Sequence, residues 1–396
     1  MALLDYDKKI QQAERNIKEA EDISQANKDK IMEFARDLRV NDYSKPRIFK
    51  LENKLKIIAK QIDFDFEDAE KEDIKDFVAW VNELDFSDAT KVDYKTVMKR
   101  FYKWLNGGEY PETVDWIKTT LGNNNGTLPK NVLNEEDIRE MLEAAENARD
   151  KALISLLWET GARIGELIDL KVGDFEDFKH GKKIIIDGKT GPRRLPLISS
   201  VPNIQAWLSA HPDGENKDAP LWVNVGTRNT GQPMQYRAIL KTLNEIAERA
   251  GIDKPVNPHH FRHSRATYMA SRFTEAQMCE YFGWVQGSDV PARYVHMSGR
   301  DIDTDYAKLH GIEDEEEPEE SELAPVDCPR CGAKNDPEAS FCQNCGQALT
   351  REAFEEIEAR EEKAGGVMAE LGVSEDEAEK VIKAAEKILE TRSEKG

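Results

Sequence analysis

A stretch rich in glycine, asparagine and proline divides the chain near residue 121. It reads LGNNNGTLPKNVLNEED and covers 121–137. These residue types favour turns and loops over helices and strands, so the stretch has the composition of a linker. A length of 396 residues also exceeds one typical domain. The sequence therefore predicts separate domains on the two sides of this linker.

A second boundary is an acidic block near the C-terminus. Residues 311–322 hold eight carboxylates in twelve positions, a pattern typical of disordered linkers. The whole chain has a net charge of −21. Residues 311–396 hold 25 acidic and 10 basic side chains, a net charge of −15, and residues 1–310 hold 52 acidic and 46 basic side chains, a net charge of −6. The acidity of the whole chain therefore does not exclude a nucleic-acid partner for the first 310 residues.

The segment before the first linker has the periodicity of helices throughout. In its clearest helix, Ser87 is a good N-cap and Gly107 and Gly108 mark the end. One apolar stripe runs along this helix, formed by Tyr94, Val97, Met98, Phe101, Trp104 and Leu105. We expect a helical bundle over 1–121.

The segment after the linker mixes helices with a β-hairpin. Helices are predicted after Asn134 and at about 235–250 and 258–273, while KKIIIDGKTGPRRLPLIS gives two β-rich runs around a glycine turn. The predicted fold class is mainly α with a small hairpin or sheet, that is, α+β. No apolar run is long enough to span a membrane, and the first residues lack a signal-peptide core, so we expect a cytoplasmic protein without a membrane partner.

Two basic residues have sequence neighbours that favour a role in binding or catalysis. Arg163 in ETGARIGELIDL lies among leucines and isoleucines and needs an anionic partner, which Glu166 could supply three residues later. The pair could be a plain intrahelical salt bridge or could aim the arginine at a phosphate. Lys189 occupies the predicted hairpin tip, where it could be merely solvated or could donate a proton to a substrate.

The stretch NPHHFRHSRATYMA at 257–270 gathers cations at one helix start, for which Asn257 is a good N-cap. His259, Arg262 and His263 share a face by their spacing, next to the positively polarised helix N-terminus. A polar surface and a zinc site are alternatives, but no glutamate lies between the histidines and the arginine would repel a metal ion. An anion site fits best. Spacing alone leaves His260 and His263 either facing DNA or supporting other site residues.

Together these motifs resemble the tyrosine recombinase (phage integrase) family. Its signature has an arginine box, a hairpin lysine, HxxR, a histidine or tryptophan after a glycine, and a tyrosine about ten residues later. The matching residues, in the same order, are Arg163 and Glu166 in TGARIGEL, Lys189 in GKTGPRR, His259 and Arg262 in HHFRH, Trp284 in FGW, and Tyr294 in ARYVH. Trp284 replaces the commoner histidine, and the loop before Tyr294 is about one residue longer than in bacterial members, which is closer to archaeal integrases.

The resemblance implies a reaction and a role for each matching residue. Tyr294 would attack a DNA phosphodiester and form a 3′-phosphotyrosine; Tyr268 and Tyr306 fit packing better. Arg163, Arg262 and Trp284 would stabilise the charge on the phosphate. His259 would assist deprotonation of the tyrosine and Lys189 would protonate the leaving 5′ oxygen, with no ATP and no cofactor for catalysis.

The same resemblance implies double-stranded DNA as partner and a homotetramer during strand exchange. A Xer-type dimer resolvase, a type IB topoisomerase-like enzyme and a non-catalytic DNA-binding regulator are the alternatives. The intact residue set disfavours the regulator, and the appended cysteine module favours a mobile-element integrase.

The module CPRCGAKNDPEASFCQNCG carries two CxxC pairs, each followed by glycine. Cys328, Cys331, Cys342 and Cys345 are predicted to hold a structural Zn²⁺, with disulfides as the alternative. The flanking acidity favours a protein partner over DNA for this C-terminal region. The predicted domains are a helical core-binding domain (1–121), a linker (122–130), a catalytic domain (131–310), an acidic linker (311–326), a zinc ribbon (327–350) and C-terminal helices (351–396).

Overall fold

The computed structural model describes residues 5–120, 131–188, 190–227, 229–295, 321–357 and 359–360. Lys189, Tyr306 and the linker at 122–130 lie outside the described residues. Most of the acidic linker and most of the C-terminal helices expected over 351–396 lie outside them as well. The chain divides into two compact units, Met1–Thr127 and Leu128–Gly396. Among the described residues, no helix is long and apolar enough to cross a membrane.

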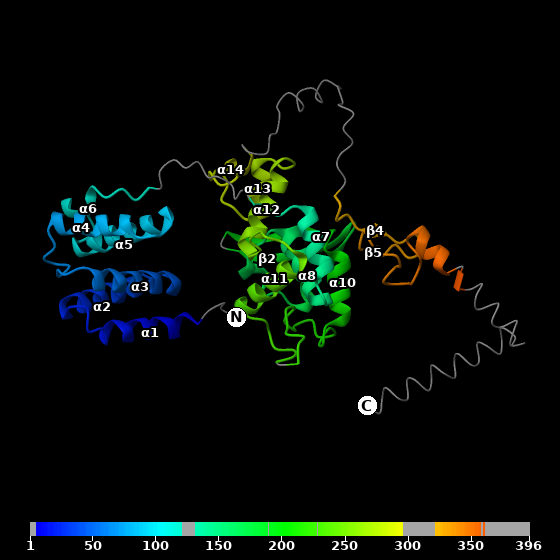
Figure 1. The fold of residues 1–396 in the computed structure, drawn as a ribbon, viewed down its shortest axis with the longest axis horizontal. Helices are drawn as coiled ribbons and strands as arrows, with labels where there is room; N and C mark the ends of the chain where they lie inside the picture. The colour runs from blue at the N-terminus through cyan, green and yellow to red at the C-terminus, as the bar shows by residue number, and fades with distance from the viewer. Residues whose placement is uncertain are drawn as a thin grey trace, which may run out of the picture. The chain divides into compact units, whose positions relative to one another are not determined.

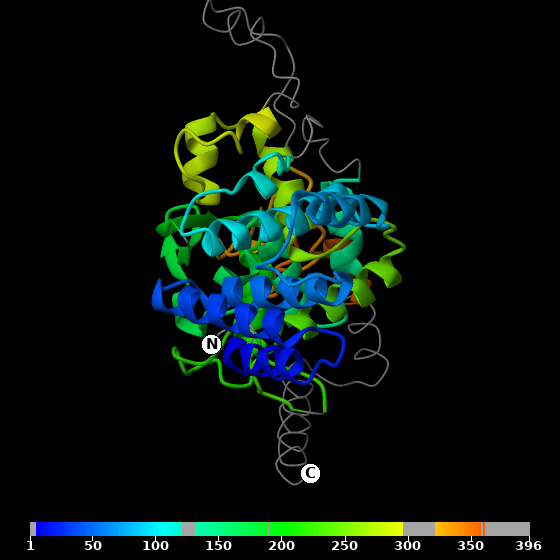
Figure 2. The ribbon, with the colours of Figure 1, turned by 90° about the vertical axis from the view of Figure 1, so that its left-hand side faces the viewer.

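The first unit is a helical bundle, drawn in blue and cyan in Figure 1. Its helices are α1 (Tyr6–Lys18), α2 (Gln25–Val40), α3 (Lys45–Gln61), α4 (Lys71–Glu83), α5 (Asp88–Leu105) and α6 (Glu112–Asp115). Helices α1, α2 and α3 lie side by side (Figures 1 and 2). The predicted cap of α5 is confirmed, because the Ser87 side chain accepts a hydrogen bond from the Thr90 amide. Of the predicted stripe, Tyr94, Val97, Met98 and Phe101 are buried and the last two residues are half-buried.

The second unit is mainly helical with small antiparallel sheets, so the predicted α+β class is confirmed. Its helices are α7 (Glu135–Ala144), α8 (Ala148–Thr160), α9 (Ile164–Leu167), α10 (Val201–Ala210), α11 (Tyr236–Ala250), α12 (Pro258–Ala270), α13 (Glu275–Phe282) and α14 (Ala292–Val295), with a short 3₁₀ helix, η1 (Val172–Asp174). Helix α8 is buried on almost every side and packs against α7, α10 and α12, so it forms the centre of this unit.

The predicted hairpin is part of a three-stranded antiparallel sheet in the order β1-β2-β3. The strands are β1 (Glu176–Phe178), β2 (Gly181–Gly188) and β3 (Gly191–Leu197), and Gly188 faces Gly191 where the hairpin turns. The inward residues of the hairpin, among them Ile184, Ile186 and Leu195, join the core around α8. The sheet thus fixes the two strand ends at Gly188 and Gly191 relative to the helices that carry the candidate site.

Candidate active site and metal centre

The end of helix α8 positions the first candidate arginine. Gly161 ends α8 with a positive φ of 52°, and a Cβ there would lie 2.7 Å from the Phe282 ring, so a larger residue does not fit. The chain then turns at Arg163, the N-cap of α9. Its Nη1 donates to Glu166 Oε1 at 3.0 Å, and its backbone N–H donates to Oε2 at 2.9 Å. The Arg163 side chain keeps 41% exposure, so it is held at one end and open to solvent.

A second arginine, Arg193 on β3, holds the other side of Glu166. Its Nη1 and Nη2 donate to the two carboxylate oxygens at 3.1 and 2.7 Å, and its Nε donates to the Tyr281 carbonyl. Burial raises the pKa of Glu166, but hydrogen bonds from Arg193 and Arg163 outweigh it and hold the pKa below its ordinary value. Glu166 is therefore an ionised bridge between strand β3 and Arg163. The sequence prediction did not include Arg193.

Arg262 on α12 is buried, which excludes the polar-surface alternative for this residue. It donates from Nη1 to the Gly161 carbonyl at 3.0 Å and from Nη2 to the Phe282 carbonyl at 2.6 Å. Burial first, and then the positive charge of Arg163, lower the pKa of Arg262 to about 10. Arg163 follows Gly161 by two residues, so both arginines lie at the end of α8, as one anion site requires. Five donors per guanidinium leave N–H groups beyond these two carbonyl contacts.

The three histidines of α12 have three different environments. His260 is buried, and its Nε2 lies 2.6 Å from the Asn131 carbonyl, so the possibility that it faces DNA is wrong. His259 is exposed, with its Nε2 3.0 Å from Nε2 of His263. The Nδ1 of His263 in turn lies 2.5 Å from the hydroxyl of Tyr294. His263 is thus the histidine that contacts the candidate nucleophile.

Tyr294 on α14 packs beside Trp284. Their rings stack 5.5 Å apart at 9°, and the Arg262 guanidinium carbon lies 5.4 Å from the Trp284 ring centroid. Burial raises the pKa of the Tyr294 phenol, and the charge of Arg262 opposes this rise. Gly283, with a φ of 61°, ends α13 and turns the chain into Trp284.

The structure therefore brings together six of the predicted residues: Arg163 and Glu166 from the start of α9, His259 and Arg262 from α12, Trp284 from the turn after α13, and Tyr294 from α14. Lys189 lies outside the described residues. Its neighbour Thr190 donates a side-chain hydrogen bond to the Gly283 carbonyl, so the described flank of the hairpin tip touches the turn before Trp284.

The four cysteines of the C-terminal module form a compact sulfur cluster. Their ligand atoms all lie within 4.8 Å of one another, and the Cys328–Cys345 and Cys331–Cys342 sulfur pairs are each 3.6 Å apart. Disulfides are not formed. A tetrahedral zinc thiolate site, with Zn–S of about 2.3 Å, has sulfurs about 3.8 Å apart. The cluster therefore has the size and the chemistry of a metal centre.

The two CxxC knuckles share one backbone design. Gly332 and Gly346 follow them with positive φ of 69° and 70°, and each donates its N–H to the carbonyl of the first cysteine of its pair at 2.8 Å. Two short strands, β4 (Val326–Asp327) and β5 (Lys334–Asn335), flank the first knuckle. Leu323, just before β4, is buried in the core of the second unit, so the end of the expected acidic linker is packed.

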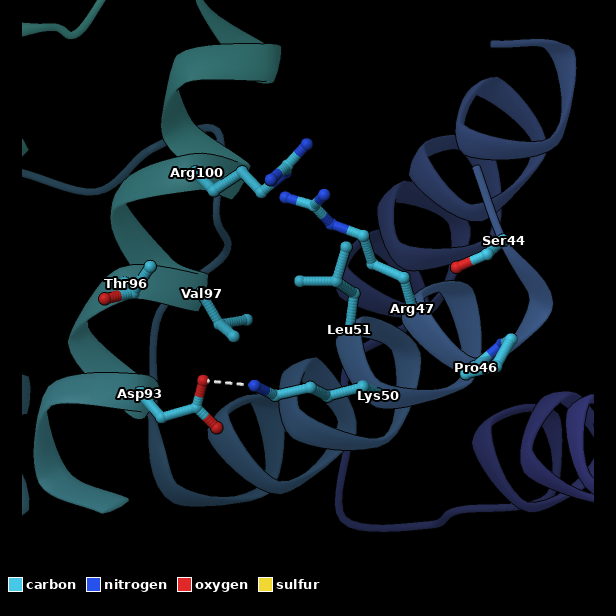
Figure 3. Close-up of a pocket in the computed structure, with 9 residues that line it drawn as sticks. All are labelled: Ser44, Pro46, Arg47, Lys50, Leu51, Asp93, Thr96, Val97 and Arg100. Atoms are coloured by element: carbon cyan, nitrogen blue, oxygen red, sulfur yellow. Dashed lines mark ion pairs between the residues drawn. The ribbon is translucent and has the colours of Figure 1, made fainter. Parts of the chain in front are cut away.

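A basic groove lies in the first unit, between α3 and α5. Figure 3 shows Arg47 and Arg100 extending toward one another across it, while Lys50 pairs with Asp93. The Tyr43 ring lies 5.2 Å from the Arg47 guanidinium carbon and 4.9 Å from that of Arg100, which also donates to the Tyr43 hydroxyl. In the part of the chain that the structure describes, neither arginine pairs with a carboxylate.

Known protein families match the two functional regions separately. Residues 131–300 match the phage integrase family, and residues 324–350 match a domain family of unknown function, DUF7577. The domain over residues 131–300 is therefore a domain of the tyrosine recombinase, or phage integrase, family.

Curated relatives are similar over part of their length. A tyrosine recombinase of Synechococcus elongatus is 35% identical over 150 residues, 36% of this chain and 44% of the relative. The tyrosine recombinase XerA of Pyrococcus furiosus is 32% identical over 153 residues, 37% of this chain and 50% of XerA. The chain thus spans about half the length of these relatives.

A solved structure has a similar fold over a larger part of the chain. The XerH site-specific recombinase, bound to a palindromic difH substrate in a post-cleavage complex, matches with a TM-score of 0.55. The match covers 76% of this chain and 95% of XerH at 18% identity. The common fold therefore includes more of the chain than the family domain alone.

Proposed function

We propose that this chain is a site-specific DNA recombinase that cleaves and rejoins DNA through a 3′-phosphotyrosine at Tyr294, without ATP. The grouping of Tyr294 with a histidine pair and two arginines at one site carries the proposal. Residues 131–310 would form the catalytic domain. The assignment to the tyrosine recombinase family supports the same chemistry.

The two arginines suit a phosphate that gains negative charge as it is attacked. Arg262 is fixed by two backbone carbonyls, and Arg163 is fixed by Glu166 with its side chain partly open. Donors that are already oriented stabilise developing charge at little reorganisation cost. We assign both arginines to the non-bridging phosphate oxygens, and the Trp284 indole N–H to a further contact.

Two protons move in this reaction. The phenol loses one as it attacks, and the leaving 5′ oxygen gains one. The resemblance assigns the first transfer to His259 and the second to Lys189. Because the phosphotyrosine retains the energy of the broken bond, attack by another 5′-OH rejoins the strands.

We propose duplex DNA as the partner of the first unit, over residues 1–121. The groove of Arg47 and Arg100 supports this assignment, since guanidiniums without carboxylate partners bind phosphates well. Strand exchange between two duplexes requires four cleavages, so we propose a homotetramer on DNA.

We further propose that the cysteine cluster holds one structural Zn²⁺. Thiolates of Cys328, Cys331, Cys342 and Cys345 would be its ligands, and the metal would stabilise a module too small for a core of its own. It would take no part in DNA cleavage.

Covalent capture tests the proposed activity. Nicked duplexes with random sequence around the nick would be incubated with the full chain, and the protein–DNA adducts would be isolated after denaturation and sequenced. Nicked substrates trap the adduct because the short released strand diffuses away. We expect adducts that enrich one sequence.

The matched variants are Tyr294→Phe and Tyr268→Phe. Tyr294→Phe should form no adduct, and Tyr268→Phe should form it at close to the wild-type rate. Absence of any adduct with the wild type would refute the enzyme proposal. Adducts without sequence enrichment, together with relaxation of supercoiled DNA, would favour a topoisomerase-like enzyme instead.

A further inference from the structure

A continuous row of polar atoms joins Tyr294 to the surface of α12. The Tyr294 hydroxyl lies 2.5 Å from Nδ1 of His263, and Nε2 of His263 lies 3.0 Å from Nε2 of His259. No contact between Tyr294 and His259 is present among the described residues. The phenol proton therefore has His263 as its nearest acceptor, with His259 one ring further away.

The protonation of the two rings decides whether such a transfer is possible. Burial, and then the neighbouring charge of His259, lower the pKa of His263 to about 4. Burial and Arg262 lower the pKa of His259 as well. Both imidazoles are then neutral near pH 7, so one nitrogen of each ring donates and the other accepts. With its proton on Nε2, His263 accepts from the phenol at Nδ1 and donates to His259.

We propose that His263 is the catalytic base that takes the Tyr294 proton, with His259 as the second member of a two-histidine relay. This inference rests on the proposed recombinase function and refines it. It replaces a direct role of His259 on the phenol.

The step balances in atoms and charge. As the Tyr294 oxygen forms its bond to phosphorus, the phenol O–H breaks and its proton moves to Nδ1 of His263. The Nε2 proton of His263 passes to Nε2 of His259, which becomes the imidazolium. The bond from phosphorus to the 5′ oxygen breaks, and that oxygen takes a proton from the acid assigned to Lys189. Rejoining reverses each transfer.

The first experiment separates a base from an acid. Adduct formation on the captured nicked duplex would be measured for wild type, His263→Ala and Lys189→Ala. The same duplex with sulfur in place of the bridging 5′ oxygen would be tested in parallel, because a thiolate leaves without a proton. We expect His263→Ala to be about 100-fold slower or more on both duplexes, a typical loss for a general base. The sulfur should rescue Lys189→Ala alone.

The second experiment asks whether His263 acts through Tyr294. A 3′-p-nitrophenyl phosphate strand replaces the phosphotyrosine, and joining to a 5′-OH strand is followed in Tyr294→Phe with and without His263→Ala. Nitrophenolate needs no proton to leave and no phenol is present, so the two proteins should join the strands at the same rate. This equality would also show that the double variant is folded.

His263→Asn distinguishes proton transfer from positioning. Its amide can still hold the phenol in place but does not take a proton at neutral pH, so adduct formation should stay slow. The inference would be overturned if His263→Ala formed the adduct at the wild-type rate, or if the sulfur-containing duplex restored its rate. It would also be overturned if His263→Asn recovered adduct formation, or if the double variant joined the strands more slowly than Tyr294→Phe. Failure of the wild type to form any adduct would instead overturn the proposed function beneath it.

Discussion

At the scale of single residues, one carboxylate organises the candidate site. Glu166 joins Arg163, which is partly exposed, to Arg193, which is buried. Gly188 allows this approach, because a Cβ there would lie 2.5 Å from the Glu166 carboxylate. The position of Arg163 therefore depends on a strand that is distant in sequence.

Arg193→Ala should destabilise the second unit by about 3 kcal/mol, since it removes one partner of a buried ion pair. Chemical denaturation of the full chain measures this loss. The matched control is Arg194→Ala on the exposed side of β3, expected to change stability by less than about 0.5 kcal/mol. Equal effects of the two variants would show that Arg193 does not support Glu166.

Local patterns made part of this site predictable. Arg163, Glu166 and the Asn257 cap of α12 are recognisable within a few residues, and the Asn257 side chain does accept from the His260 amide. Arg193 was missed, and His263 was left without an assigned role, because their partners are 27 and 31 positions away. Only the inward position of Arg193, by alternation in GPRRLPL, could have hinted at its role.

Glu52 in the first unit gives a prediction about pH. It is fully buried on α3 and pairs with Arg39, and burial raises its pKa to about 7 despite Arg39, with Glu14 adding to the rise. A raised carboxylate pKa favours the fold at low pH, and this contribution is lost as the pH rises from about 4.5 through about 7. The loss amounts to roughly 3 kcal/mol at most.

Glu52→Gln should remove this pH dependence. Hydrogen exchange of α3 peptides would be measured in the full chain and corrected for intrinsic exchange rates. Relative to wild type, the protection of α3 in Glu52→Gln should increase as the pH rises from about 5 to about 8. Glu33→Gln, at an exposed ion pair on α2, is the control and should show no such gain. A constant difference between Glu52→Gln and wild type would contradict the raised pKa.

At the scale of elements, helix ends were predicted more reliably than short strands. Ser87, Asn134 and Asn257 cap helices as expected, because a cap depends on residues three positions apart. Strand β1, at Glu176–Phe178, was not predicted, since three residues carry no detectable alternation. It forms because β2 offers a free edge for pairing.

The groove between α3 and α5 should contribute to DNA affinity through phosphate contacts. Arg47→Ala and Arg100→Ala should each weaken binding to all DNA sequences and lower the slope of log affinity against log salt by about 1. Fluorescence anisotropy with the captured duplex at several salt concentrations measures both. Arg15→Ala on α1 removes the same charge outside the groove and should leave the slope unchanged. If Arg47→Ala and Arg100→Ala left the slope of log affinity against log salt unchanged, the groove would not be a DNA-binding site.

At the scale of the whole molecule, the cysteine module and the segment just before it make polar contacts with helix α7 of the same unit. Glu338 pairs with Arg139 on α7 at 3.6 Å, and Ser321 donates to Glu135 at 2.5 Å. Glu338 thus joins the module to α7 of its own chain, and Ser321 joins the preceding segment to the same helix. The separate protein partner that the sequence favours for this region stays a prediction.

Metal analysis of the full chain should find one zinc ion per chain. Cys328→Ser and Cys342→Ser should lose it, and a chelator should raise hydrogen exchange in the module while α8 stays protected. Cys279→Ser, which changes a buried cysteine outside the cluster, should keep the metal. Zinc retained by both ligand variants would contradict a four-cysteine site.

The central claim is that Tyr294 becomes covalently joined to DNA. The most direct test is mass spectrometry of the captured adduct after digestion with nuclease and trypsin. Cleavage after Arg293 and Arg300 leaves the peptide YVHMSGR, which begins with Tyr294. We predict that this peptide carries the added 3′-nucleotide on its tyrosine. A nucleotide attached instead to Tyr268, Tyr306 or a serine would contradict the account.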